Sequence, residues 1–225
     1  MFVEMAYPLS PEMPVFPGLP HDEFISLSRM SSGGEANTSL VRYPLHNGTH
    51  VDAPCHFYDG GRTIDQIPIA DFIFSRPLLI RKNLPKGGLL QPEDLEASGP
   101  MLRFADILLL CTGYHALRAN TSTYVDDFPA LSPEAARMIR SDLLNVKAVA
   151  IDTLSIESCT RGPKSGFVVH KSLLDGSMYR TRPLLIFEDV NLGPILEKTI
   201  SRIFAFPLRL LGLEASPVNM IAEVP

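Results

Sequence analysis

Short apolar runs bounded by turn residues recur along most of this chain, and this pattern predicts strands joined by brief connections. The run at 146–152 is apolar along most of its length, which is typical of a central strand covered on both faces. The predicted strands are PLLIR (77–81), DILLLCTG (106–113), VKAVAID (146–152), PLLIFE (183–188), ISRIFAFPLRLL (200–211) and PVNMIAEV (217–224).

The N-terminal part carries a different pattern. The proline-rich stretch 9–20 predicts extended chain, because proline lacks the N–H that a helix needs. FISLSRM (24–30) alternates apolar and polar residues and predicts a half-buried strand. The polar, glycine-containing stretch 31–39 predicts a loop, after which 40–51 resumes strand character.

The clearest helix signal is LSPEAARMIRSDLL (131–144). Ser132 suits the N-cap, Pro133 the first helical position, and Glu134 the positive end of the helix dipole. Shorter helices are expected near 92–97, 170–175 and 191–199. Strands outnumber helices and the two are interleaved, so we expect one mixed α/β domain over residues 1–225 without an internal repeat.

Composition narrows the classes of function. The chain is 45% hydrophobic and 20% charged, as in an ordinary globular protein. A net charge of -5 without a Lys/Arg cluster argues against a nucleic-acid partner. No apolar run reaches the roughly 20 residues that span a bilayer, and the N-terminus lacks signal-peptide features. Three widely spaced cysteines indicate a reducing compartment, so we expect a cytoplasmic protein with a small-molecule partner.

One stretch concentrates side chains that can bind metal ions or transfer protons. LHNGTHVDAPCHF (45–57) holds His46, His50, Asp52 and His56, although the chain has only 6 histidines. These four positions are all even-numbered, so they share one parity and would face the same side of an extended strand, in which alternate side chains point the same way. His50 and Asp52 can therefore reach one ion, whereas His46 lies farther along and needs a bend at Asn47-Gly48.

Imidazole and carboxylate ligands suit zinc, manganese or ferrous iron, and a carboxylate between histidines can bridge two ions. Burying four such groups without partners would cost several kcal/mol, which favours a metal site. A hydrogen-bonded polar cluster and a purely structural metal are the alternatives. Cys55 has the opposite parity and is expected to be a packed thiol, while His21 and His115 are expected to be ordinary surface or loop residues.

HNGTHVDAPCHF resembles the HxGTHxDxPxHF signature of the metal-dependent cyclase family, which includes bacterial kynurenine formamidases and isatin hydrolases. Weaker similarities follow in the family's order: YPLSPEMPVFPG, DGGRTIDQIP, VKAVAIDTLSIE and FAFPLRLLGLEASPVNMIA. This resemblance implies the family's swivelling β/β/α fold and a homodimer or homotetramer. The chain departs from the family in a longer segment between Asp152 and Glu188, and in Asn219, where an arginine is common.

The resemblance also implies a role for each matching position. His46, His50 and Asp52 match ligands of the first metal, and Asp52 matches the bridge. His170 and Glu188 match the remaining ligands of a second ion, so the implied cofactor is one or two divalent ions, zinc or manganese. His56 matches the proton donor and acceptor, and Phe16 stands where formamidases carry a tryptophan that contacts substrate.

The expected function is therefore a metal-dependent hydrolase that cleaves a C–N bond of a small amide or lactam. Metal-activated water would attack the carbonyl, with His56 as the general acid and base. Phe16, Phe57 and Tyr58 would offer an aromatic surface to the substrate. The alternatives are a metal-dependent cyclase or dehydratase of a biosynthetic pathway, and a non-catalytic metal-binding module.

Overall fold

The computed structural model describes residues 1–225 and contains thirteen strands. They are β1 (Phe2–Glu4), β2 (Glu23–Ser28), β3 (Thr38–Arg42), β4 (His50–Asp52), β5 (Ile73–Phe74), β6 (Pro77–Arg81), β7 (Leu89–Leu90), β8 (Ile107–Cys111), β9 (Ala130–Leu131), β10 (Ala148–Ile151), β11 (Leu185–Glu188), β12 (Arg202–Pro207) and β13 (Ala215–Glu223). The α-helices are α1 (Pro92–Glu96), α2 (Thr121–Tyr124), α3 (Pro133–Asp142), α4 (Gly162–Ser165) and α5 (Val168–Leu174).

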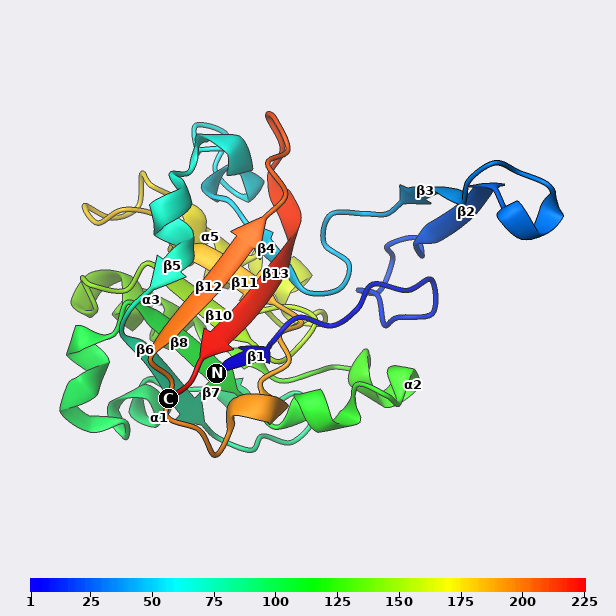
Figure 1. Cartoon of the computed structure of the whole chain (residues 1–225). Coiled ribbons are helices and arrows are strands. Elements are labelled where there is room, and N and C mark those ends of the chain that lie inside the picture. Colours follow the sequence, from blue (N-terminus) through cyan, green and yellow to red (C-terminus); the bar gives the residue numbers. More distant parts are fainter.

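Nine strands form one long sheet in the order β5-β12-β13-β4-β11-β10-β8-β6, with β1 added to β13 (Figure 1). Strands β6, β8, β10 and β11 run parallel, and β4 pairs antiparallel with both β11 and β13. The short strand β4 therefore joins the parallel half of the sheet to the antiparallel half. The two termini meet beside this sheet, where the Met1 ammonium group donates to the Val224 carbonyl at 2.7 Å.

Two hydrophobic cores lie on opposite faces of the parallel strands. The strand-side core packs β12 and β13 over one face, and it includes Phe74 and Phe187, whose ring centroids are 6.0 Å apart. The helix-side core packs α3 and α5 over the other face and includes Ile139 and Ile186. Each fully buried Ile or Phe side chain stabilises the fold by about 1.5–3 kcal/mol relative to leaving it exposed.

Local sequence signals explain the best-defined elements. Ser132 caps α3 by accepting a hydrogen bond from the Ala135 N–H at 3.0 Å, and Pro133 occupies the first turn. Strand β10 is buried at every position between β8 and β11, which confirms the expected central strand. Strand β6 covers the same residues as its prediction, and the mixed, strand-rich α/β architecture is likewise confirmed.

Three local predictions were wrong. Strand β2 pairs only with β3 in a hairpin that projects from the body, so it is exposed rather than half-buried (Figure 1). The stretch 40–51 is not one strand, because β3 ends at Arg42 and β4 begins at His50. The helix expected at 191–199 is reduced to a 3-10 turn at Gly193–Ile195, since glycine and Pro194 both weaken a helix interior.

The remaining short elements are 3-10 turns: Met30–Ser32, Pro54–His56, Ile64–Gln66, Ile69–Phe72, Gly99–Phe104, Tyr114–Leu117 and Gly193–Ile195. None of the helices is long and apolar enough to cross a membrane.

Candidate metal centre

Strand pairing brings the first two candidate residues together. His50 on β4 lies directly opposite Glu188 on β11, and directly opposed side chains of an antiparallel pair share one face. Asp52, two residues on from His50, points to the same face. Nε2 of His50 is consequently 3.4 Å from Asp52 Oδ1 and 3.4 Å from Glu188 Oε2.

His46 reaches this cluster through the bend predicted at Asn47-Gly48. Its Nδ1 lies 3.0 Å from Asp52 Oδ1. Gly48 has φ +66, and a Cβ there would come within 2.6 Å of a Leu9 side-chain carbon, so the bend requires glycine. The Asn47 amide anchors the bend by donating to Asp22 Oδ1 at 2.9 Å.

His56 arrives by a different route from the one predicted. The strand ends at Asp52, and His56 lies on the 3-10 turn Pro54–His56, so strand parity does not place it. Pro54 begins that turn because its fixed φ suits a first helical position. The turn sets the His56 ring 4.2 Å from the His46 ring and 6.0 Å from the His170 ring, measured between centroids.

His170 enters from the helix side. It lies within α5 and is 4% exposed, so it is neither a cap nor a surface residue. Its Nε2 is 3.3 Å from Glu188 Oε1 and 4.0 Å from Asp52 Oδ2. Its Nδ1 lies 2.9 Å from Glu157 Oε2, and a proton held there leaves the Nε2 lone pair directed at the two carboxylates.

The centre of the cluster contains buried polar atoms without hydrogen-bond partners. They are Nε2 of His50 and both carboxylate oxygens of Asp52. His50 Nδ1 faces the Gly48 carbonyl at 2.9 Å, which favours a proton on Nδ1 and a free lone pair on Nε2. Buried groups of this kind are costly unless something satisfies them, and a divalent ion satisfies all three together. The donor set of imidazole and carboxylate fits such an ion.

Protons balance the charges of the ion-free cluster. Burial by itself would raise the pKa of Asp52, but the charges of His56 and His46 outweigh it and hold that pKa well below its usual range. Burial would lower the pKa of His170, but hydrogen bonds to Glu157 and Glu188 raise it to about 10. Burial would lower the pKa of His50, but the nearby carboxylates of Asp52 and Glu188 raise it, so an ion bound at His50 Nε2 would displace a proton there.

His56 behaves in the opposite way. Burial lowers its pKa to about 4, and the charges of His46 and His170 lower it further against the attraction of Asp52. His56 is therefore a neutral imidazole at neutral pH, with a lone pair available to accept a proton.

A pocket of about 210 Å³ opens onto the cluster. His46, His56, His170 and Glu188 form its polar end. Its apolar walls are Phe16, Leu19, Phe57, Leu154 and Phe167. Phe16 thus lines the same cavity as the candidate ligands, whereas Tyr58 is not among the lining residues.

Two residues outside the predicted set have defined roles in the geometry. Glu157 orients His170, and its position in the quoted segment VKAVAIDTLSIE was the only sequence signal for it. His115 is not an ordinary loop residue, because its Nδ1 lies 2.9 Å from the buried Asp152 carboxylate. His21 is exposed and Cys55 packs against the strand-side core, as expected.

The fold and cluster define an α/β protein with a buried, pocket-facing site for a divalent ion. Residues 3–158 match the Cyclase family, and the chain belongs to this family.

A kynurenine formamidase of Bordetella petrii is 29% identical over 97% of this chain and 95% of its own length. Isatin hydrolase A from Ralstonia solanacearum shares the fold with a TM-score of 0.82, at 20% identity over 99% of this chain and 91% of that one. A protein described as a predicted metal-dependent hydrolase from Bacillus stearothermophilus has a TM-score of 0.75, at 23% identity over 99% and 97% of the two chains.

Glu157→Gln is expected to weaken binding of a divalent ion by about 10–100-fold, the usual cost of losing an outer-shell carboxylate partner of a metal-binding histidine. Glutamine keeps the side-chain size, so the fold should survive, but it no longer favours a proton on His170 Nδ1 by charge. Equilibrium titration with zinc measures the effect, and Glu134→Gln on the exposed face of α3 is the control. Equal affinities for the two variants would remove Glu157 from the site.

Proposed function

We propose that this protein is a metal-dependent hydrolase that cleaves a C–N bond of a small amide or lactam. The observation that carries the proposal is the buried group of His50, Asp52 and Glu188, whose inward atoms lack partners while the cluster opens into an apolar pocket. A structural metal site is coordinatively closed, whereas a catalytic site keeps one position open toward substrate. The pocket favours the catalytic arrangement.

We propose zinc or manganese as the ion, held by His46, His50, Asp52, His170 and Glu188. Within this cluster, two groups of side chains are close enough to hold an ion: His50, Asp52 and Glu188, and His46, Asp52 and His56. Asp52 is common to both, which supports its role as the bridge if two ions bind. We assign His56 to proton transfer, because it borders the pocket and is neutral at neutral pH.

Different residues of the chain have different roles in the proposed reaction. A bound divalent ion supplies Lewis-acid activation of water and of the substrate carbonyl. A ring nitrogen of His56 accepts the proton of the attacking water and passes it to the leaving nitrogen of the substrate. Glu157 keeps a proton on Nδ1 of His170, and the Ile156 N–H donates to Glu188 Oε1 at 2.7 Å, which holds that carboxylate in place.

The pocket walls support a flat, aromatic substrate. Phe16, Phe57 and Phe167 face a cavity of about 210 Å³, a size that suits a small molecule with one or two rings. Relatives named kynurenine formamidase and isatin hydrolase are consistent with an aryl formamide or a benzo-fused lactam. N-Formylkynurenine and isatin are therefore the first substrates to assay.

Product analysis tests the reaction class against the cyclase or dehydratase alternative. Hydrolysis in ¹⁸O-labelled water is expected to release an acid that carries one labelled oxygen per C–N bond cleaved. A ring-closed or dehydrated product without label would replace the hydrolase proposal by the cyclase one. A metal-loaded protein that turns over none of the substrates would support a non-catalytic module.

The apparent affinity for a divalent ion is expected to rise as pH increases from neutrality toward 10. His170 has a pKa raised to about 10 in the ion-free protein, so an ion must displace its proton. Protonated His170 also stabilises the folded state. This contribution to the free energy of unfolding is fully present below the unfolded pKa of 6.5, and it is lost as pH rises through the folded pKa of about 10. Calorimetric titration across this range, in buffers of different ionisation enthalpy, measures both affinity and released protons. A pH-independent affinity would contradict the assignment of His170.

We also propose that the chain forms a homodimer or homotetramer in the cytoplasm. Three free cysteines support a reducing compartment. The projecting β2–β3 hairpin leaves Phe24 46%, Leu27 61% and Val41 47% exposed, and an isolated two-stranded hairpin is at best marginally stable. Light scattering is expected to report an oligomer for the wild type and a monomer for Leu27→Glu with Val41→Glu. A monomeric wild type would contradict the proposal.

A further inference from the structure

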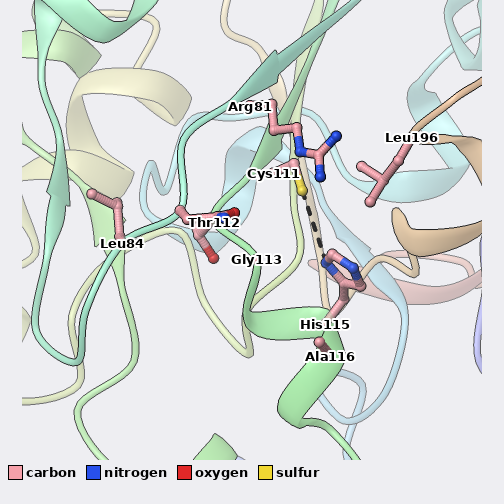
Figure 2. Close-up of a pocket in the computed structure, with 9 residues that line it drawn as sticks. Arg81, Leu84, Cys111, Thr112, Gly113, His115, Ala116 and Leu196 are labelled. Carbon is pink, nitrogen blue, oxygen red and sulfur yellow. Dashed lines mark hydrogen bonds between the residues drawn. The ribbon is translucent and has the colours of Figure 1, made fainter.

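A second group of metal-ligating side chains lies outside the site described above. Cys111 Sγ is 3.8 Å from Nδ1 of His115 and 3.7 Å from Oδ2 of Asp152, and these last two atoms are 2.9 Å apart. The three atoms fall within 4.8 Å of one another. Figure 2 shows the His115 ring turned toward the Cys111 sulfur, at the edge of a pocket of about 280 Å³.

The parallel strands explain why these residues meet. Cys111 is the last residue of β8, and Asp152 directly follows β10, the parallel neighbour of β8. His115 lies in the 3-10 turn Tyr114–Leu117, which begins after β8 ends. The carboxyl ends of parallel strands lie at one edge of the sheet, which is where α/β proteins commonly place their ligand sites.

This group and the first cluster lie on opposite faces of the sheet. Cys111 belongs to the strand-side core together with Ala150 and Phe187. Ile186 belongs to the helix-side core, and Glu188 shares its face because alternate strand residues point the same way. The pocket beside Cys111 and the pocket beside Glu188 have no lining residue in common. Binding at one is therefore separable from binding at the other.

The spacing of the three atoms fits a single ion. Bonds of about 2.0–2.3 Å at tetrahedral angles place ligand atoms about 3.3–3.6 Å apart, so shifts of a few tenths of an ångström suffice. The main change is chemical, because the ion takes the place of the hydrogen bond between His115 Nδ1 and Asp152 Oδ2. Asp152 stays fixed, since its Oδ1 accepts from the Thr112 N–H at 2.8 Å and from the Thr112 hydroxyl at 2.7 Å.

Two other interpretations account for less of the geometry. Asp152 also orders the turn after β8, because its Oδ2 accepts from the backbone N–H groups of Gly113 and His115, but that role does not explain the adjacent thiol. A nucleophilic cysteine is disfavoured, since burial and the Asp152 charge raise the Cys111 pKa to about 12.

A neighbouring strand also carries a cation. Arg81 lies opposite Cys111 on β6, but its guanidinium pairs with Glu197 at 3.1 Å.

We propose that Cys111, His115 and Asp152 form a further metal site that binds a zinc-like divalent ion, with the fourth position open to the pocket. Thiolate, imidazole and carboxylate together select zinc or its cobalt substitute over harder ions such as magnesium. On binding, the thiol releases one proton to solvent, and His115 ligates through Nδ1 as a neutral imidazole with its remaining proton on Nε2. The thiolate and the carboxylate then balance the two positive charges of the ion.

Cobalt absorption spectroscopy tests this site independently of the first one. Thiolate bound to Co²⁺ gives an intense near-ultraviolet charge-transfer band, and the imidazole and carboxylate ligands of the first cluster do not. Full-length protein titrated with cobalt is expected to show this band. Cys111→Ser should lose the band together with one equivalent of bound cobalt, while Cys55→Ser and Cys159→Ser should keep both.

A second variant covers the case in which serine disturbs the buried strand end. His115→Gln changes a side chain that is 14% exposed. The cobalt affinity measured from the charge-transfer band is expected to fall at least about tenfold in this variant. Circular dichroism checks that the variants are folded. Absence of the band in wild-type protein, its persistence in Cys111→Ser, or an unchanged affinity in His115→Gln would overturn the proposal. The cobalt band does not depend on hydrolysis, so the result of this experiment is independent of the result of the hydrolysis assays that test the proposed function.

Discussion

Asp52→Asn is expected to abolish metal binding at the first cluster and, with it, hydrolysis. Asp52 is fully buried, and its two oxygens face His46, His50 and His170. Loss of an outer-shell partner alone costs about 10–100-fold in metal affinity, so loss of a central carboxylate ligand should cost at least about 100-fold. Elemental analysis of protein purified without chelator, together with the hydrolysis rate, measures both effects.

The substitution should also destabilise the ion-free protein. The pKa of Asp52 is depressed in the folded state, so its charge stabilises the fold at neutral pH, and this stabilisation is lost as pH falls through the folded pKa. Asp59→Asn, on the exposed turn that follows the cluster, is the matched control and should change neither metal content nor rate. Normal metal content in Asp52→Asn would remove Asp52 from the ligand set.

His56→Ala is expected to keep the metal but lower kcat by about 10²–10⁴-fold, the usual contribution of a positioned general acid or base. The ring of His56 lines the pocket and has a pKa lowered to about 4, mainly by burial. Its neutral form is the active base, so the rate should fall as pH drops through the pKa of His56. Loss of this acid limb in the pH–rate profile is expected for His56→Ala.

The comparison with metal content distinguishes a proton carrier from a ligand. His56 is close enough to His46 and Asp52 to form a group that could hold an ion. If His56→Ala lost metal in proportion to activity, His56 would be a ligand and the proton-transfer assignment would be wrong. His21→Ala, a change at an exposed histidine, controls for nonspecific effects of removing imidazole.

The parts of the fold that follow from local pattern were predictable. Strand β6, the capped helix α3 and the buried central strand β10 all depend on short-range periodicity or capping chemistry. The exposure of β2 was not predictable, because the alternation of apolar and polar residues does not say what covers the apolar face. Here the only partner of β2 within the chain is β3, and both project from the body (Figure 1).

The same limit applies to the site. Strand parity correctly set His50 and Asp52 on one face, and the flexibility of Gly48 correctly indicated the bend that returns His46. Parity failed for His56, because Pro54 starts a 3-10 turn that rotates the chain out of the strand. The residue still reaches the cluster, but through a turn.

Residues that act through long-range contacts left almost no local signal. His170 was predicted only through the family resemblance, and Glu157 was not predicted. The two are separated by 13 positions, and their contact depends on how α5 packs against the sheet. Cys111 and Asp152 meet only because β8 and β10 are parallel neighbours, a pairing that a single sequence does not specify. Pairing between distant strands and helices therefore accounts for most of what was missed.

The central claim is that the cluster of His50, Asp52, His170 and Glu188 is a hydrolytic metal centre. Chelator-stripped wild-type protein, titrated with zinc or manganese while the hydrolysis of N-formylkynurenine and isatin is followed, tests it most directly. The expected result is no turnover without metal and full recovery on stoichiometric addition, absent in Asp52→Asn. Hydrolysis at the full rate by metal-free protein would contradict the claim.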